Sequence, residues 1–256
     1  MVTQAAEAGP LDTLGPLIHN PQVVAKLQQS GVRAIASLDD AQSGKVVFPS
    51  HGVPQDVRED ARRRRLEVVD ATCPFVRKVQ QRAKHLAKEG YKVVVVGDAQ
   101  HSEVRGILSA AGPDAVAVTS AEEVANIQWP DKVGVVAQTT QLTERFAQVV
   151  SALACVTHEV RAFNTICYAT FDRQQAALDL AGNVEVMFVV GGRNSANTAR
   201  LRELCEERGV PTYHVETADE ICGDWALGKS VAGLTAGAST PDWIIEEVRR
   251  KLGEMG

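Results

Sequence analysis

The sequence predicts an α/β protein made of three similar modules, each with a small parallel sheet. Short valine-rich runs at residues 92–97, 133–136 and 184–190 are typical of buried parallel strands, and an amphipathic stretch of ten or more residues follows each run. Two kinds of strand–loop–helix unit also occur three times each along the chain. The alternation and the repeat together favour three α/β modules that follow one another in sequence.

In the first kind of unit, a polar loop follows the strand. The strands begin near residues 45, 93 and 188, and their loops carry His51, His101, Glu103, Ser195 and Asn197. Pro54 suits the first turn of a helix, whereas Gly112 and Gly209 suit the C-terminal caps of the helices that start near residues 103 and 195. These helix signals agree with the strand pattern.

The second kind of unit ends its strand in small hydroxyl residues. The strands end near residues 69, 136 and 235, and their loops carry Thr72, Cys73, Thr139, Thr140, Ser239 and Thr240. Helices are expected to follow, for example over residues 143–153 and 242–252. We place the three modules at residues 1–73, 74–165 and 166–256.

The composition is that of a globular protein and argues against nucleic-acid-binding and membrane-spanning proteins. With 45% hydrophobic and 23% charged residues, the chain is typical of globular domains. Its net charge of -5 argues against a general nucleic-acid-binding protein, because such domains carry a basic surplus. No run approaches the ~20 apolar residues of a membrane span, and the first residues lack the pattern of a signal peptide. We therefore expect a cytoplasmic protein without nucleic-acid or membrane partners.

Five cysteines occur, an odd number without any C-x-x-C motif, so a disulfide framework is not expected. Cys155 and Cys205 follow helical apolar stripes and are predicted to be small core residues. Cys73 and Cys167 differ from them. They lie in polar segments of the kind that joins a strand to a helix, where a thiolate could be presented to a site.

A run of four arginines at residues 62–65 ends a predicted helix. Cations complement the negative C-terminal end of a helix dipole, so a solvated helix end is favoured over a nucleic-acid-binding patch.

The polar loops as a set indicate a phosphate site. Ligands of parallel sheets bind beyond the carboxyl ends of the strands, and helix N-termini there offer unpaired N–H groups. The side chains that could face such a ligand are His51, His101, Glu103, Thr139, Thr140, Ser195, Asn197 and Ser239. For any single Ser, Thr or Asn, a simple N-cap of its helix is the alternative. For the whole set, phosphate oxygens explain the inventory better.

Eight polar segments occur in the order and approximate spacing found in the 4-hydroxy-3-methylbut-2-enyl diphosphate reductase (LytB) family. They contain Ile18-His19-Asn20, Ser50-His51-Gly52, Thr72-Cys73-Pro74, His101-Ser102-Glu103, Gln138-Thr139-Thr140, Ile166-Cys167-Tyr168, Asn194-Ser195-Ala196-Asn197 and Ala238-Ser239-Thr240. Any one segment would be a weak signal, whereas the eight together are highly specific. The chain resembles this family from about Asp12 to its C-terminus.

The resemblance implies a trefoil of three α/β modules around a [4Fe-4S] cluster. It implies the reductive dehydroxylation of (E)-4-hydroxy-3-methylbut-2-enyl diphosphate to isopentenyl and dimethylallyl diphosphates, the last step of the non-mevalonate (MEP) isoprenoid pathway. Cys73 and Cys167 would be thiolate ligands of the cluster, and Glu103 with Thr139 would relay the proton. The diphosphate would be held by His19, His51, His101, Thr139, Ser195, Asn197 and Ser239. A ferredoxin or flavodoxin would deliver the electrons, since the sequence has no nucleotide-binding G-x-G-x-x-G motif.

The chain departs from the family pattern at its start. The family's first cysteine lies in a Gly-Phe-Cys-containing segment, which nothing in residues 1–11 matches. Residues 1–9 resemble the tail of the helix after that segment, so we expect a fragment or a misplaced start. Ala196 also leaves one fewer hydroxyl group for the substrate. The alternative hypothesis is a cluster-free, inactive α/β module that binds a phosphorylated metabolite.

Overall fold

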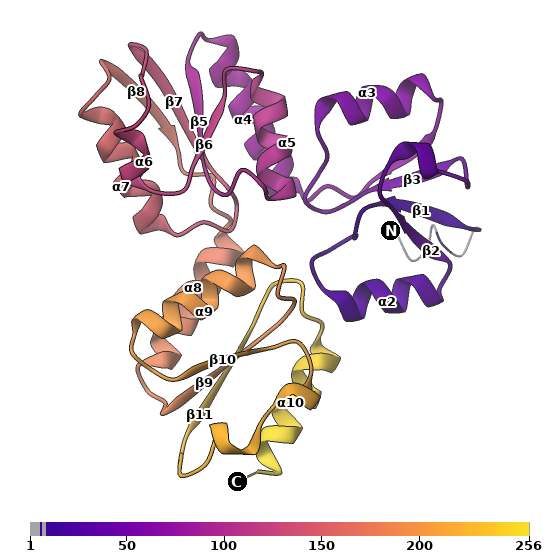
Figure 1. Ribbon diagram of the computed structural model, residues 1–256, viewed down its shortest axis with the longest axis vertical. Coiled ribbons are helices and arrows are strands. Elements are labelled where there is room, and N and C mark those ends of the chain that lie inside the picture. The colour runs from indigo at the N-terminus through magenta and orange to yellow at the C-terminus, as the bar shows by residue number, and fades with distance from the viewer. Residues whose placement is uncertain (1–5, 7–8, 256) are drawn as a thin grey trace. The chain divides into compact units, whose positions relative to one another are not determined.

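The computed structural model describes residue 6 and residues 9–255, in which strands and helices alternate (Figure 1). Within these residues the strands form three parallel sheets, which confirms the predicted α/β class. The chain divides into two compact units. Unit 1 comprises the residues up to Ile18 together with Ala25–Cys167, and unit 2 comprises His19–Val24 and the chain from Tyr168 onward. The predicted module boundaries and the trefoil arrangement stay predictions.

The first sheet of unit 1 has the strand order β2-β1-β3-β4 in the described residues. Its strands are β1 (Leu11–Leu14), β2 (Val32–Ile35), β3 (Lys45–Phe48) and β4 (Glu67–Asp70), and α2 (Pro21–Gln29), η1 (Leu38–Asp40) and α3 (Gln55–Arg63) connect them. Val46 and Phe48 pack in one apolar cluster with Ala61 of α3, whereas Val47 packs in another with Leu27 of α2. Alternate residues of β3 therefore point to opposite faces of the sheet.

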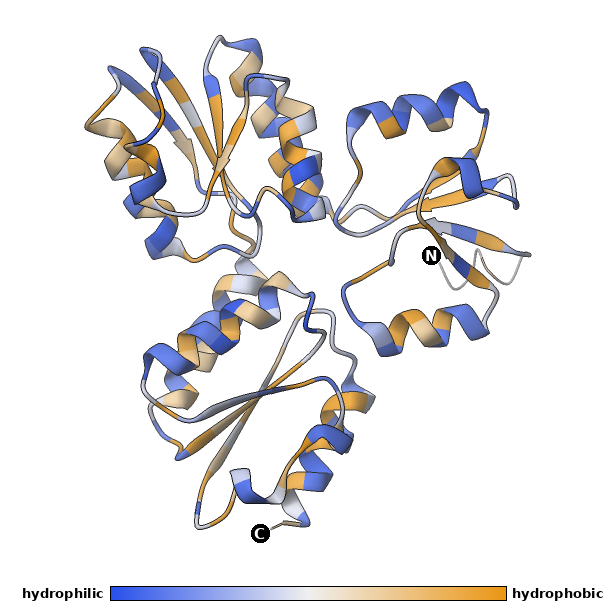
Figure 2. Ribbon diagram, viewed as in Figure 1, coloured by the Kyte–Doolittle hydropathy of each residue, from blue (hydrophilic) through white to orange (hydrophobic). Residues whose placement is uncertain are grey.

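The second sheet of unit 1 has the order β6-β5-β7-β8 in the described residues. Its elements are α4 (Pro74–Lys88), β5 (Lys92–Val96), α5 (Ser102–Ala111), β6 (Val116–Val118), α6 (Ala121–Val124), β7 (Lys132–Ala137), α7 (Thr143–Ala154) and β8 (Glu159–Phe163). Val93 and Val95 pack against α4 and α5, and Val94 and Val96 pack against α7. The helices α4 and α5 lie side by side (Figure 1), and Figure 2 shows the apolar residues along them. Helices on both faces explain why residues 93–96 of β5 are all valines and all buried.

The sheet of unit 2 has the order β10-β9-β11 in the described residues. Its elements are α8 (Tyr168–Ala181), β9 (Val186–Val190), α9 (Ala196–Glu207), β10 (Thr212–Val215), η2 (Ala218–Glu220), η3 (Gly223–Trp225), β11 (Ala232–Ala236) and α10 (Asp242–Gly253). Every residue of β9 is buried. Met187 and Val189 pack with α8 and α9, and Phe188 and Val190 pack with α10 on the other face.

Most predicted helix ends lie within a residue or two of those observed. Gly112 caps α5 with a φ of 103°, a backbone conformation that glycine adopts easily. The prediction for Cys205 is confirmed, because its side chain is buried in α9. The prediction for Cys155 is wrong, because this residue is exposed at the C-cap of α7. The last buried residue of that helix is Leu153, and two helical steps turn the next side chain by about 200° to the opposite side.

The parallel strands place the predicted site residues at the carboxyl edges of the sheets. The loops after β3, β4, β7 and β8 carry His51, Cys73, Thr139 and Cys167, in that order, and Glu103 lies in the first turn of α5, which follows β5. Ser239 lies in the loop after β11, and Asn197 lies in the first turn of α9, which follows β9. None of the helices in the described residues has the length and apolar character needed to cross a membrane.

Candidate active site

A buried carboxyl group lies at the centre of the polar loops of unit 1. Glu103, in the first turn of α5, is only 3% exposed. Its Oε1 accepts a hydrogen bond from the N–H of Thr139 at 2.7 Å, and its Oε2 accepts one from the Thr139 hydroxyl at 2.9 Å. The internal repeat predicted that these two residues would lie close together. The structure brings them into direct contact.

Burial raises the pKa of Glu103 to about 7, although the two hydrogen bonds from Thr139 act in the opposite direction. Burial acts this way because the charged form of a carboxyl group loses more hydration than the neutral form. A carboxyl group with this pKa is partly protonated at neutral pH. It can therefore deliver a proton, which an ordinary surface carboxylate at pH 7 does poorly.

His101 is the N-cap of α5 and precedes the carboxyl group by two residues. Its Nδ1 accepts a hydrogen bond from the N–H of Glu103 at 3.2 Å. In a neutral ring, the proton therefore resides on Nε2, which becomes a donor. His51 follows β3 and is 9% exposed. Both imidazoles thus belong to unit 1, at the carboxyl edges of its two sheets.

Gly97 explains how α5 approaches the loop after β7. A Cβ atom at this position would lie 2.9 Å from the side chains of Gln138 and Val104. Any larger residue at the end of β5 would push α5 away from Thr139. Gln138 itself is 3% exposed, and sequence analysis did not identify its packing role.

Two cysteines of unit 1 lie at the starts of helices. Cys73 is the N-cap of α4, and its N–H donates to the carbonyl of Ser50 at 2.8 Å. Cys167 immediately precedes α8, and its N–H donates to the carbonyl of Thr139 at 3.0 Å. Both side chains are half-buried free thiols. Among the described residues, no group of three His, Cys, Asp or Glu side chains is placed to hold a metal ion.

The polar loops of unit 2 hold an amide group with no hydrogen-bonding partner. Asn197, in the first turn of α9, is 4% exposed, and neither its Nδ2 nor its Oδ1 has a partner in the part of the chain that is described. Ser195 is the N-cap, because its Oγ accepts from the N–H of Thr198 at 3.3 Å. The simple-cap alternative therefore holds for the Oγ of Ser195 but not for Asn197.

His19 joins the same unit through its backbone. The hydroxyl of Ser239 donates to the carbonyl of His19 at 3.4 Å. A Cβ atom at Gly192 would overlap that carbonyl, so only glycine lets the two loops approach this closely. Burial lowers the pKa of His19 below its usual value, and its imidazole is therefore neutral at pH 7.

Comparisons with known proteins identify the family of this chain. A family model described as LytB protein matches residues 1–253. The chain belongs to the LytB family. Proteins named 4-hydroxy-3-methylbut-2-enyl diphosphate reductase are 51% identical in Pelobacter propionicus, over 98% of this chain and 91% of the relative, and in Geobacter sulfurreducens, over 100% and 91%. The predicted resemblance is confirmed.

Two solved LytB-family structures are similar to this chain over most of its length. One, titled as (E)-4-hydroxy-3-methyl-but-2-enyl diphosphate reductase, the terminal enzyme of the non-mevalonate pathway, is 41% identical with a TM-score of 0.70 and covers 99% of this chain and 92% of that one. The other, titled as E-1-hydroxy-2-methyl-but-2-enyl-4-diphosphate reductase from Plasmodium falciparum, is 28% identical with a TM-score of 0.91. It covers 97% of this chain and 82% of that one.

The packing role of two threonines in unit 2 was not predicted from the sequence. The Oγ1 atoms of Thr198 and Thr240 would lie 2.7 and 2.6 Å from a Cβ atom at Gly191, so both threonines fill the space that this glycine leaves. Thr240 donates to the carbonyl of Val190 at 3.0 Å, which ties the loop after β11 to the end of β9. The glycine pair at residues 191–192 was the only sequence signal of this close packing.

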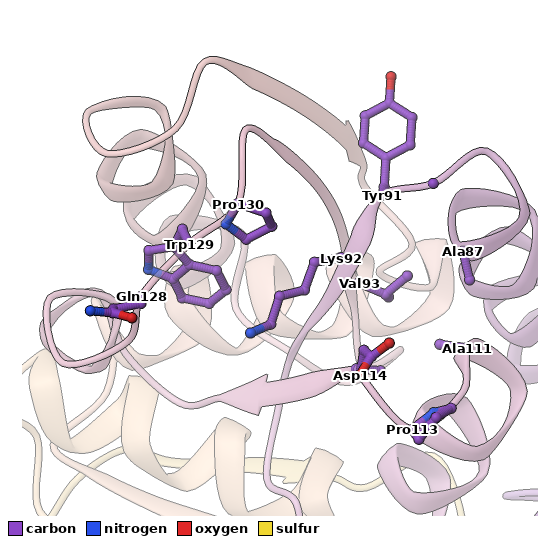
Figure 3. A pocket seen from close by; sticks show the side chains of 12 residues that line it. Ala87, Tyr91, Lys92, Val93, Ala111, Pro113, Asp114, Gln128, Trp129 and Pro130 are labelled. Atoms are coloured by element: carbon purple, nitrogen blue, oxygen red, sulfur yellow. The ribbon is translucent and has the colours of Figure 1, made fainter.

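Unit 1 has a cavity of about 630 Å³, and none of the predicted site residues lines it. It lies at the amino end of β5, where Lys92 begins the strand, and Trp129 forms part of its wall (Figure 3). The Nζ of Lys92 lies 5.4 Å from the centre of the Trp129 ring. The predicted catalytic residues are at the opposite, carboxyl edge of this sheet, so we do not assign the cavity to the site.

Proposed function

We propose that this chain is an iron–sulfur oxidoreductase that performs the reaction named by its relatives. (E)-4-Hydroxy-3-methylbut-2-enyl diphosphate would take up two electrons and two protons, lose its allylic hydroxyl group as water, and yield isopentenyl and dimethylallyl diphosphates. This is the last step of the non-mevalonate isoprenoid pathway, here in the cytoplasm. Family membership across nearly the whole chain supports the proposal. The observation that carries it is the buried, protonatable Glu103.

Glu103 supplies the proton that turns the hydroxyl group into a water leaving group. A carboxyl group with a pKa of about 7 holds that proton at neutral pH and can release it within the reaction. The Thr139 hydroxyl, 2.9 Å from Oε2, is in position to relay it. Because both side chains are nearly excluded from water, the proton is transferred to the substrate rather than to solvent.

The diphosphate is held by polar side chains and by the N-terminus of α9. The orphaned amide of Asn197 supplies a donor that needs an acceptor, and a phosphate oxygen is such an acceptor. The first N–H groups of α9 add a positive dipole end. We assign the diphosphate contacts to His19, His51, His101, Thr139, Ser195, Asn197 and Ser239.

Cys73 and Cys167 fit the thiolate ligands of a [4Fe-4S] cluster. Both are free, half-buried thiols at helix starts, and iron–sulfur clusters are held by cysteine sulfur atoms. When bound, such a cluster supplies electrons and a Lewis-acidic iron for the hydroxyl oxygen. We assign the electron supply to a ferredoxin or a flavodoxin.

The test uses anaerobically prepared full-length protein. Cys73→Ser and Cys167→Ser should each lose most of the bound iron and acid-labile sulfide, because serine is a poor ligand for this cluster. Cys155→Ser, which changes an exposed cysteine, should retain both. With the substrate and a chemical reductant, the unaltered protein should form both products, which chromatography detects.

Two outcomes would contradict the proposal. Equal iron content in all three variants would remove Cys73 and Cys167 from the ligand set. Tight binding of the diphosphate by a preparation with no iron and no turnover would instead favour the cluster-free binding module.

A further inference from the structure

A second polar cleft lies in unit 1, between α3, α4 and α5. It has a volume of about 330 Å³. Its lining contains none of the residues assigned to catalysis, substrate binding or the cluster. The polar side chains around it are Gln55, Arg58, Arg62, Asp70, Arg77, Gln80, Gln81 and Lys84. The floor is completed by Val53, Gly106 and Ala110.

The cleft is strongly cationic. Four of its lining side chains carry a positive charge, two from α3 (Arg58 and Arg62) and two from α4 (Arg77 and Lys84), against the single carboxylate of Asp70. The net charge of the lining is therefore +3, in a protein whose net charge is -5. The concentration of positive charge is thus a local feature and does not follow from composition.

One arginine of the cleft is held rigidly. The Nη1 of Arg58 lies 2.9 Å from Oδ2 of Asp70, and its Nη2 donates to the Thr72 hydroxyl at 3.2 Å. Its guanidinium also lies over the ring of Phe48, 5.2 Å from the centroid. A guanidinium fixed in this way loses little conformational entropy when it binds an oxyanion.

The one carboxylate of the cleft is already engaged. Burial alone would raise the pKa of Asp70, but hydrogen bonds from Arg58 and Thr72 outweigh it and hold the pKa below its ordinary value. Asp70 is therefore ionised at neutral pH, and Arg77 shares it at 3.4 Å. Its negative charge offsets part of the positive charge of Arg58 and Arg77. It does not offset the charges of Arg62 and Lys84, the other two cations of the cleft.

Arg62 and Lys84 differ from Arg63 and Arg64 in their ion-pair partners. Arg63 and Arg64 both pair with Asp60, as a solvated helix end would predict. Within the described residues, no carboxylate pairs with Arg62 or Lys84, and both line the cleft. Cations that face one another across a cleft repel, and an anion between them reverses the sign of that interaction.

We propose that this cleft is a second binding site, for a small oxyanion with two or more negative charges, of the phosphate or diphosphate type. Its volume fits such a group, and arginines recognise phosphoryl oxygens through paired N–H donors. The site does not depend on the proposed function, because no residue of the catalytic or cluster machinery lines it.

Calorimetric titration of the full-length protein with inorganic diphosphate tests this site. The double variant Arg62→Gln with Lys84→Gln should weaken the binding event at the cleft by at least about tenfold, since each lost contact is a charge-assisted one. The matched control, Arg63→Gln with Lys88→Gln, removes the same charge from the same two helices outside the cleft. It should leave the affinity within about twofold.

The proposed active site also binds diphosphate, so the two events must be separated. Asn197→Ala, in unit 2, should weaken only the active-site event, and the effect of the cleft variant should persist in that background. Titration with inorganic phosphate tests a free anion, and titration with methyl diphosphate tests the phosphoryl group of an organic molecule. Binding of each anion at the cleft should depend on Arg62 and Lys84.

Thermal unfolding gives a second, independent measure. Without added anion, the double variant should melt no lower than the unaltered protein, because it removes repulsion. With diphosphate, the unaltered protein should gain more in melting temperature than the variant. Equal losses of affinity in the variant and its control, unchanged affinity in both, or binding of an acidic polypeptide alone without diphosphate binding would each overturn the proposal.

Discussion

Two buried polar groups, Glu103 in unit 1 and Asn197 in unit 2, differ in whether the fold supplies their hydrogen-bonding partners. In unit 1, both oxygens of Glu103 accept hydrogen bonds from Thr139. In unit 2, the amide of Asn197 is equally buried, and neither of its polar atoms has a partner in the described part of the chain. The carboxyl group of Glu103 has its partners within the fold, whereas the amide of Asn197 has none there, and a ligand can supply them.

The difference agrees with the roles that we propose for the two groups. A proton donor must keep its geometry and its pKa before the substrate arrives, so its hydrogen bonds are built into the fold. A group that binds a diphosphate must instead leave its hydrogen bonds available. The cost of an unpartnered buried amide, about 1 to 3 kcal/mol, is offset when the ligand binds.

The largest effect is expected when the carboxyl group of unit 1 is replaced. Glu103→Gln keeps the shape but cannot deliver a proton, so turnover with a chemical reductant should fall by about 100- to 10,000-fold while cluster content stays unchanged. Glu144→Gln, an exposed glutamate in the first turn of α7, is the matched control and should keep normal turnover. Near-normal turnover of the Glu103 variant would exclude this residue from proton transfer.

A smaller effect concerns the pH dependence of stability. The pKa of Glu103 is raised to about 7 in the folded protein, from an ordinary value of 4.5, so the folded state binds this proton more tightly than the unfolded chain does. Its contribution to the free energy of unfolding is fully present below pH 4.5 and is lost as the pH rises through about 7. The loss should be on the order of 3 kcal/mol.

Urea unfolding between pH 4.5 and 8 measures this contribution. The difference between the unaltered protein and Glu103→Gln should change across that window, because glutamine does not titrate. Glu144→Gln should follow the unaltered protein at every pH. Parallel curves for Glu103→Gln and the unaltered protein would show that the carboxyl group has an ordinary pKa.

The smallest effect is expected in unit 2, where a substitution should increase the stability of the ligand-free protein. Asn197→Leu removes a buried amide without partners and keeps a similar volume, so the free energy of unfolding of the ligand-free protein should rise by about 1 kcal/mol. The affinity for a product diphosphate should fall at the same time. Denaturant unfolding with and without isopentenyl diphosphate measures both. A loss of stability without ligand would mean that Asn197 has structural partners, and the contrast between the units would disappear.

Local sequence patterns were sufficient to predict the α/β fold. Buried parallel strands have a valine-rich signature, and the repeated order of strand, polar loop and helix placed Glu103 near Thr139 before any contact was known. The catalytic and binding roles of the site residues stay proposals. Cys155 was misplaced because an apolar stripe does not reveal at which turn a helix ends.

Features that depend on the packing of distant segments were not predictable. Thr198 and Thr240 fill the space beside Gly191, and the glycine pair at residues 191–192 does not by itself indicate which loops meet there. The cationic cleft shows the same limit. Arg62 was attributed to a solvated helix end, because the position of Lys84 on a facing helix follows from tertiary structure and not from periodicity.

Unit 2 is assembled from two stretches of chain that are far apart in sequence. The hydrogen bond between Ser239 and His19 joins residues 220 positions apart. On the ribosome, at roughly 5 to 20 residues per second, the loop that carries His19 would emerge about 10 to 45 s before its partner in β11–α10 exists. The first strands of unit 1 can pair in that interval, but the loops that carry His19 and Ser239 cannot close on each other. Completion of this site is therefore one of the last events in the biogenesis of the protein, after most of its secondary structure has formed.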